Sequence, residues 1–225
     1  MKMKIITQII LFLFPWCIRY RLMNYLFNYS IDKTAYIGLS IIMADRLVMK
    51  KKSKIKSFTI IKNINNLEIG YNSRINFLNW ITGINYKKKS FIYENDGYCE
   101  MIIGANTRIT ARHSFDCNGG IYIGDFTTIA GSGTKFLSHS VDVFSNRQTA
   151  GPIRVGNYCF VSTSCILLKN SELPSFSVLA AGSILNKKFK DTNVLYGGIP
   201  ARNLKELPME DVKYFTRLNP DVTAY

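Results

Sequence analysis

A six-residue repeat is the feature that most constrains the fold of this chain. From Val155 onward the sequence reads VGNYCF, VSTSCI, LLKNSE, LPSFSV and LAAGSI, and Leu185 follows. The first position of each hexad is Val or Leu, and the fifth is Cys or Ser. A helix of period 3.6 cannot keep one face apolar at a spacing of six, and a period-two strand would need an alternation that these segments lack. The spacing indicates a solenoid of three-sided coils, in which position one points inward and a small position five lies next to the turn.

The same pattern occurs earlier in the chain. Hexads begin at Ile69 and Ile75, at Ile103 and Ile109, and at Ile123 and Ile129, and a weaker set runs from Ile31 through Ile37. Breaks in this register predict two loops, at residues 84–100 and 141–154. Long loops on a solenoid tend to lie on its binding face.

Five cysteines are present, and their spacing matches neither a disulfide framework nor a zinc motif. Such usage fits a reducing compartment. Cys159 and Cys165 occupy the fifth position of their hexads, which serine takes in the following units. We therefore interpret both as packing residues and not as nucleophiles.

The charge of the chain favours an anionic partner. Lys and Arg number 29 against 15 Asp and Glu, which gives a net charge of +14. This excess suits a nucleotide-bearing cofactor, an acidic glycan or an anionic membrane face, although a solvated basic surface explains it equally well. Nucleic acid is not expected as a partner, because the basic residues form neither an arm nor a recognisable reading module.

The N-terminal segment combines apolar and basic side chains. Its apolar run from Ile5 to Phe14 lacks a following small-x-small cleavage site, is too short to cross a bilayer, and is interrupted by Pro15. Arg19 and Arg21 lie among aromatic and aliphatic residues, as in a segment that lies in a membrane interface. The alternative is that this segment packs on the body of the protein.

Three stretches resemble the hexapeptide-repeat acyltransferases, namely IGDFTTIAGSGT, LAAGSI and the ending YGGIPARNLK. The resemblance covers residues 31–206 and is greatest to O-acetyltransferases that act on sugars in capsule, O-antigen and exopolysaccharide synthesis. It implies an all-β solenoid, a left-handed parallel β-helix over residues 31–190. A short helical extension over residues 1–30 would precede it, and a C-terminal extension over residues 191–225 would follow.

The resemblance also implies a reaction and an assembly. The expected donor is acetyl-CoA, the expected acceptor is a saccharide hydroxyl, and no metal is expected. Active sites would lie between neighbouring subunits of a homotrimer. We expect a cytoplasmic location, at the inner face of the membrane if the N-terminus contacts lipid.

The two histidines of the chain, His113 and His139, each open a His-Ser-apolar-Asp tetrapeptide. FLSHSVD, with the loop after it, matches the place where the family carries its catalytic histidine, so the resemblance assigns the general base to His139. A neutral imidazole at cytosolic pH suits this role. Asp142 is expected to accept the other ring N–H of His139, and a backbone carbonyl or Asp116 remains an alternative partner.

His113 falls at a hexad position that prefers small residues. A bulky side chain there breaks the local rule, which is typical of a functional position. We expect His113 either to line an acceptor pocket with Asp116 and Asn118 or to have a structural role. We expect His113 and His139 to lie about one coil apart, on neighbouring sides, and the two tetrapeptides to present similar turns to one cleft.

The resemblance places the pantetheine arm of the donor along small residues and its phosphates near basic ones. The expected cofactor-binding residues are Ser162, Ala180, Ala181, Gly182, Lys187, Lys188 and Arg202.

Three other functions compete with O-acetylation. One is N-acetylation of a nucleotide-linked amino sugar, and another is a binding solenoid without catalysis. A zinc enzyme similar to the γ-type carbonic anhydrases would need three histidine ligands, and the chain supplies only two histidines.

Overall fold

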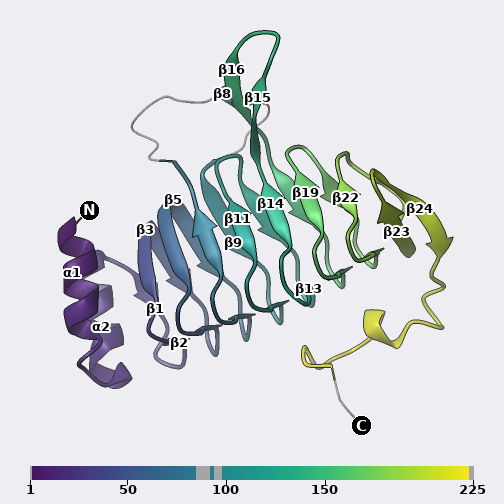
Figure 1. The fold of residues 1–225 in the computed structure, drawn as a ribbon. Helices are drawn as coiled ribbons and strands as arrows, with labels where there is room; N and C mark the ends of the chain where they lie inside the picture. Colours follow the sequence, from purple (N-terminus) through teal and green to yellow (C-terminus); the bar gives the residue numbers. More distant parts are fainter. Residues whose placement is uncertain (1, 85–91, 94–97, 223–225) are drawn as a thin grey trace.

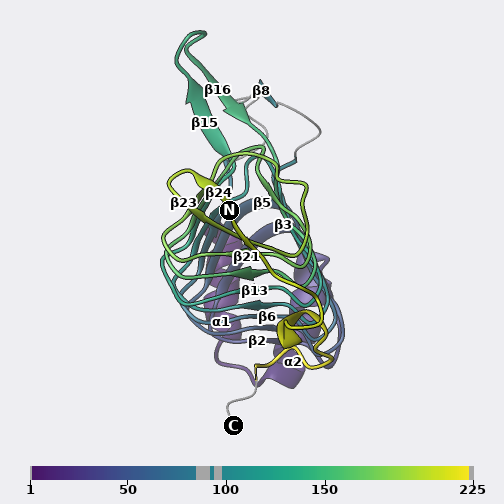
Figure 2. The same ribbon diagram turned by 90° about the vertical axis from the view of Figure 1, so that its right-hand side faces the viewer.

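The chain forms a left-handed parallel β-helix, a three-sided prism of stacked coils, as predicted (Figure 1). The computed structural model describes residues 2–84, 92–93 and 98–222, and everything below refers to these residues. Figure 2 looks along the prism and shows the coils stacked behind one another.

Each face of the prism is a parallel sheet with one short strand from each coil. The first face contains β1 (Ser30–Ile31), the ends of β3 (Ile41–Met49) and β5 (Ile60–Ile69), β9 (Glu100–Ile103), β12 (Ile121–Ile123), β17 (Ile153–Val155) and β20 (Glu172–Leu173). The second face contains β2 (Tyr36–Ile37), β4 (Lys54–Ile55), β6 (Arg74–Ile75), β10 (Arg108–Ile109), β13 (Thr128–Ile129), β18 (Phe160–Val161), β21 (Val178–Leu179) and β23 (Val194–Gly198). The third face contains the starts of β3 and β5, β7 (Trp80–Thr82), β11 (Ser114–Asp116), β14 (Lys135–Leu137), β19 (Ile166–Leu168) and β22 (Ile184–Leu185).

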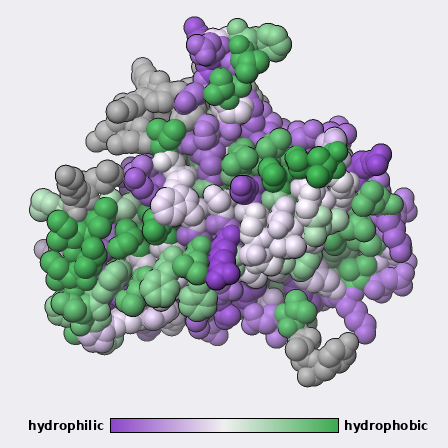
Figure 3. All heavy atoms as spheres, in the orientation of Figure 1, coloured by the Kyte–Doolittle hydropathy of each residue, from purple (hydrophilic) through white to green (hydrophobic). Residues whose placement is uncertain are grey.

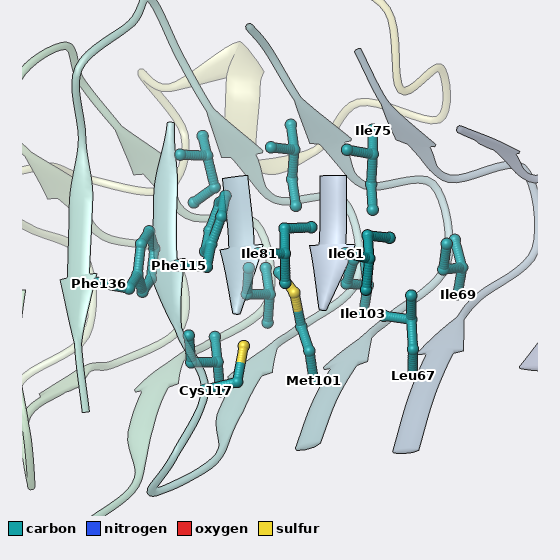
Figure 4. Packing of buried hydrophobic residues seen from close by; sticks show 14 of the residues in the cluster. Ile61, Leu67, Ile69, Ile75, Ile81, Met101, Ile103, Phe115, Cys117 and Phe136 are labelled. Atoms are coloured by element: carbon teal, nitrogen blue, oxygen red, sulfur yellow. The ribbon is translucent and has the colours of Figure 1, made fainter. Parts of the chain in front are cut away.

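The first position of every predicted hexad points into the prism and is buried. Ile75, Ile109, Ile129 and Val161 follow one another in direct register on the second face, and all are fully buried. On the third face the inward ladder includes Phe115 and Phe136, whose rings stack with centroids 4.7 Å apart (Figure 4). Burial of one such side chain contributes about 1.5–3 kcal/mol. The inward ladder is therefore the main source of stability.

The small fifth position is also confirmed. Cys159, Cys165, Ser171, Ser177 and Ser183 are all buried. Burial raises the pKa of the Cys159 thiol to about 12 and raises that of Cys165 as well, so both stay protonated at neutral pH. Both cysteines are packing residues, as the sequence indicates.

Two helices, α1 (Lys2–Leu11) and α2 (Trp16–Phe27), close the first end of the prism. A terminal coil exposes a row of unpaired backbone groups, which must be covered. Side chains of the helices cover each face in turn: Asn24 bonds the N–H and C=O of Ile31, Trp16 donates to Ala35 O, and Gln8 bonds the N–H and C=O of Ile42. The N-terminal segment thus packs on the prism through these polar groups and through buried apolar side chains such as Leu11 and Met23.

At the other end β23 pairs antiparallel with β24 (Ala201–Glu206). The chain then returns along the second face and includes a short 3-10 helix, η1 (Lys213–Phe215). Tyr214 donates to Cys159 O, and Arg108 forms an ion pair with Asp221 at 2.6 Å. These contacts hold the returning segment against the coils.

Insertions gather at one corner of the prism, which we call the hairpin corner: the turns after β7, β11, β14 and β19. In the first coils β3 and β5 pass round this corner as continuous strands. In a later coil the predicted loop 141–154 forms most of a hairpin of β15 (His139–Asp142) and β16 (Arg147–Ala150), which projects from the prism (Figures 1 and 2). Of the predicted loop 84–100, residues 85–91 and 94–97 lie outside the described residues, but β8 (Ile92–Tyr93) pairs with β16.

Candidate active site

His139 lies at the hairpin corner, at the first residue of β15. Its side chain is 34% exposed. The preceding residue, Ser138, is buried, donates from Oγ to Asp116 O at 2.6 Å, and accepts from Gly119 N at 2.8 Å. These bonds fix the backbone from which the imidazole emerges, so the ring position is set by two successive coils.

Asp116, the last residue of β11, holds His139 through two contacts. Its Oδ2 accepts from the backbone N of His139 at 3.0 Å and also contacts ring Nδ1. The bond to the carboxylate, together with its negative charge, raises the pKa of His139 above 6.5 despite partial burial, because both favour the protonated ring. With Nδ1–H directed at Asp116, Nε2 is the basic nitrogen of the neutral ring.

Asn118 orients the carboxylate of Asp116. The side chain of Asn118 is buried, its Nδ2 donates to Asp116 Oδ1 and lies 3.3 Å from His139 Nδ1, and its Oδ1 accepts from Ile84 N at 2.7 Å. The backbone N of Asn118 donates to the same Oδ1 of Asp116 at 3.2 Å. Asp116 and Asn118, both predicted as acceptor-pocket residues, therefore lie directly against His139.

The structure corrects the expected hydrogen-bond partner of His139. Asp142 contacts the turn of the hairpin, because its carboxylate accepts from Ser145 Oγ at 2.6 Å and from Phe144 N at 3.0 Å. The Ser145 bond lowers the pKa of Asp142. The ring contact of His139 is with Asp116, the alternative that the sequence left open.

The structure does not bring the two histidines together. His113 precedes β11, whereas His139 follows β14, so they lie at opposite ends of neighbouring third-face strands. His113 is 2% exposed, its Nε2 lies 2.8 Å from Thr110 Oγ1, and its Nδ1 accepts from Thr134 N at 3.2 Å. Of the two expected roles, these contacts match the structural one. The duplicated tetrapeptides are not equivalent turns, and the aspartate of the first holds the histidine of the second.

The residues predicted to bind the donor separate into two groups. Ser162, Ala180, Ala181 and Gly182 lie at the corner between the second and third faces. Ala181 and Gly182 are exposed there, Gly182 has φ +70°, and a Cβ added to Gly182 would meet no atom within 4 Å. Gly131 and Gly133 occupy the same corner, one coil before Ser162 and two coils before residues 180–182. We call residues 131–133, 162–164 and 180–182 the small-residue corner.

The basic members of the predicted donor site are not all close to this corner. Arg202 pairs with Gly197, and a Cβ on Gly197 would lie 3.0 Å from Ala180 Cβ, so Arg202 is near the small-residue corner. Lys187 and Lys188 follow β22 at the other end of the third face, where Lys188 forms a β-bridge with Glu172. On a single chain these lysines are near the hairpin corner instead.

Ser138 is the site residue that the sequence did not reveal. It directly precedes His139 and fits the preference for small buried residues next to a turn, which is a weak signal. Among the described residues, no group of three His, Cys, Asp or Glu side chains is arranged to hold a metal ion.

No protein-family model matches this sequence, and no curated protein matches it either. Similarity is found among solved structures. A mutant of AntD, an N-acyltransferase from Bacillus cereus, in complex with dTDP and coenzyme A has a TM-score of 0.56 at 17% identity, over 80% of this chain and 87% of AntD. A second AntD mutant, with dTDP-4-amino-4,6-dideoxyglucose and coenzyme A, has a TM-score of 0.54 at 19% identity, over 77% and 86% of the two chains.

The polySia-specific acetyltransferase NeuO has a TM-score of 0.52 at 18% identity, over 79% of this chain and 80% of NeuO. At these identities the comparisons establish a shared fold. The fold expected from the resemblance to hexapeptide-repeat acyltransferases is thus the fold of acyltransferases of known structure.

The burial of His113 predicts acid-sensitive stability. Desolvation lowers the pKa of His113 to about 4 from 6.5, so the unfolded chain binds a proton that the folded chain rejects between these values. The free energy of unfolding should therefore fall as pH drops from 6.5 to about 4, by up to about 3 kcal/mol from this residue. Denaturant titrations of wild type and His113→Gln across this range measure the difference.

His139→Gln is the matched control for that experiment. The pKa of His139 is raised in the folded protein, so His139 contributes stability below pH 6.5 that is lost as pH rises through its folded pKa. The acid-side loss should persist in this variant. An equal loss in His113→Gln and wild type would contradict the assignment.

Proposed function

We propose that this protein transfers an acetyl group from acetyl-CoA to a hydroxyl of a saccharide. The observation that carries the proposal is the His139–Asp116 pair at the hairpin corner. A carboxylate on Nδ1 leaves Nε2 as the proton acceptor and favours the imidazolium that forms when the ring takes a proton.

His139 acts as the general base in a direct transfer. Its Nε2 removes the proton of the acceptor hydroxyl while the hydroxyl oxygen attacks the thioester carbonyl. The carbon–sulfur bond then breaks, and the imidazolium returns the proton to the departing sulfur. No covalent enzyme intermediate is needed, which agrees with the burial and raised pKa of Cys159 and Cys165.

The small-residue corner is the proposed site of the donor. A pantetheine arm needs a stretch of surface where side chains do not block the backbone, and the exposed Ala181 and Gly182 provide one. Arg202, exposed near Ala180, suits a phosphate of the donor. Use of this donor, together with the unpaired cysteines, favours a cytoplasmic location.

We further propose that each site forms between two copies of the chain in a homotrimer. On one chain His139 and the small-residue corner lie at opposite ends of β14 and β19. A second copy that packs beside the first can bring its own small-residue corner to His139. The same packing would bring Lys187 and Lys188, near the hairpin corner, to a donor held by the neighbour.

N-acylation of a nucleotide-linked amino sugar is the second candidate, because the fold is similar to that of AntD, an N-acyltransferase crystallised with a dTDP-amino sugar. The His139–Asp116 pair favours the hydroxyl acceptor. An alcohol is a poor nucleophile until its proton is being removed, whereas a neutral amine attacks without prior deprotonation.

Replacement of His139 by Ala tests the role of the base. Incubation with acetyl-CoA and a panel of free, nucleotide-linked and lipid-linked glycans should release free thiol, and the variant should be slower by roughly 10²–10⁴-fold because it lacks the base. Mild alkali should remove the acetyl group from the product, because it is an ester. An alkali-stable product would identify an amide and favour the second candidate, and thiol release unchanged in the variant would exclude this mechanism.

The pH dependence of kcat/KM tests the same role. Because His139 must be neutral to act, kcat/KM should fall as pH drops through its pKa, which Asp116 raises above 6.5. Asp116→Asn removes the charge and the strongest bond, so the acid limb should move to lower pH while kcat falls by up to about 10⁴-fold. Asp142→Asn, on the same hairpin, should leave the acid limb in place. If the acid limb of kcat/KM stayed at the same pH in Asp116→Asn, Asp116 would not set the pKa of the catalytic base.

The activity of mixed trimers tests whether each site is shared between two chains. His139→Ala lacks the base, and Ala181→Trp should block the small-residue corner, so each variant alone should be inactive. Trimers formed by co-expression of both should recover about a quarter of wild-type activity, because some sites combine an intact His139 with an intact corner from a neighbour. No recovery in verified mixed trimers would place both residues of each site on one chain.

A further inference from the structure

The helical cap of α1 and α2 has an unusual distribution of side chains. The side of α1 that faces the prism is partly polar: Gln8 bonds the backbone of Ile42, and Lys4 donates to Ala44 O at 2.7 Å. The exposed side of α1 and the turn after it is apolar, and its most exposed residues are Met3 (81%), Ile6 (56%), Ile9 (53%), Ile10 (52%) and Leu13 (85%). Most aliphatic side chains of α1 thus face away from the prism, unlike those of a helix on an apolar core.

The first coil explains this reversal. Its faces present unpaired backbone N–H and C=O groups at the open edge, so the cap must offer polar side chains inward. Of the aliphatic side chains of α1, Leu11 is buried against the prism, whereas Ile6, Ile9 and Ile10 remain outside. Figure 3, in the orientation of Figure 1, shows a continuous hydrophobic surface at the end of the molecule where α1 and α2 lie. A contiguous apolar surface of this kind marks an interaction site.

The charge of the chain gathers at the same end. Residues 1–56 contain eleven Lys and Arg against two Asp, a net charge of +9 out of +14 for the whole chain. Residues 1–31 contain no acidic residue. Among the exposed cations are Arg21 on α2 and, in the first two coils, Lys33, Lys51 and Lys52. The end of the prism that carries the cap is therefore strongly basic.

We propose that the cap binds the surface of an anionic lipid bilayer, with the outer side of α1 in the interface and these cations on lipid headgroups. The combination of an apolar helix face with Lys and Arg at the same end of the molecule suits such a surface. A second copy of the cap is a poorer partner, because two caps face to face would oppose eleven cations from each chain with only two acids from each.

The contact is peripheral and not spanning. No helix within the described residues is long and apolar enough to cross a bilayer. The 10 residues of α1 extend about 15 Å, half of the ~30 Å hydrocarbon core. His139 follows β14, four strand spacings from β3, so this part of the hairpin corner would lie roughly 20 Å from the first coil. The proposal does not depend on the acyl-transfer reaction.

Vesicle binding of the full-length protein tests this proposal. Wild type should co-sediment with vesicles of equal parts phosphatidylglycerol and phosphatidylcholine, and binding should weaken as salt is raised and on vesicles of phosphatidylcholine alone. Ile6→Ser combined with Ile10→Ser should lower the partition coefficient by about tenfold or more, because both side chains lie on the outer side of α1. Lys51→Glu combined with Lys52→Glu should lower it on the anionic vesicles.

Leu218→Ser is the matched control, since Leu218 is 91% exposed in the returning C-terminal segment and should not contribute. Circular dichroism of each variant verifies that the fold is intact. Equal binding by wild type and Ile6→Ser/Ile10→Ser would overturn the proposal. The proposal would also be overturned if wild type did not bind the vesicles and sedimentation velocity showed dimers that the Ile6→Ser/Ile10→Ser substitutions dissociate.

Discussion

The structure depends on the stacking of inward aliphatic side chains from one coil onto the next. A single coil has too few residues to bury its own apolar positions, and its backbone groups find partners only in the coils before and after it. The direct register of Ile109, Ile129 and Val161 meets both requirements at once. The ends of such a stack are necessarily incomplete, and this is why the cap presents Gln8 and Asn24 inward.

Stacking also decides where the chain is free to vary. The faces are fixed by strand pairing, so insertions are tolerated only at the corners. At the hairpin corner the early coils pass without interruption, whereas the coil after β14 extends into the β15–β16 hairpin. His139 stands at the base of that hairpin, where its neighbour Ser138 and, from the preceding coil, Asp116 hold it. A rigid support beneath a variable insertion suits a binding or catalytic position.

The two imidazoles show how one local sequence takes two roles. Around His113, desolvation without a nearby charge lowers the pKa and keeps the ring neutral. Around His139, the carboxylate of Asp116 outweighs partial burial and raises the pKa. The difference arises because His113 lies just before β11 and His139 just after β14, at opposite ends of neighbouring third-face strands, so two similar tetrapeptides have different surroundings.

The sequence by itself determined the solenoid, its inward ladder, the small buried fifth position and the insertion that follows His139, because a period of six, and a break in it, are local properties that few folds can satisfy. It did not determine that Asp116 contacts the ring in place of Asp142, that His113 lies away from His139, or that Lys187 and Lys188 lie apart from the small-residue corner. These relations join different coils, and they depend on how many residues each corner inserts. Strand pairing in three dimensions sets that register, because a one-residue slip of a strand would turn its inward side chains outward.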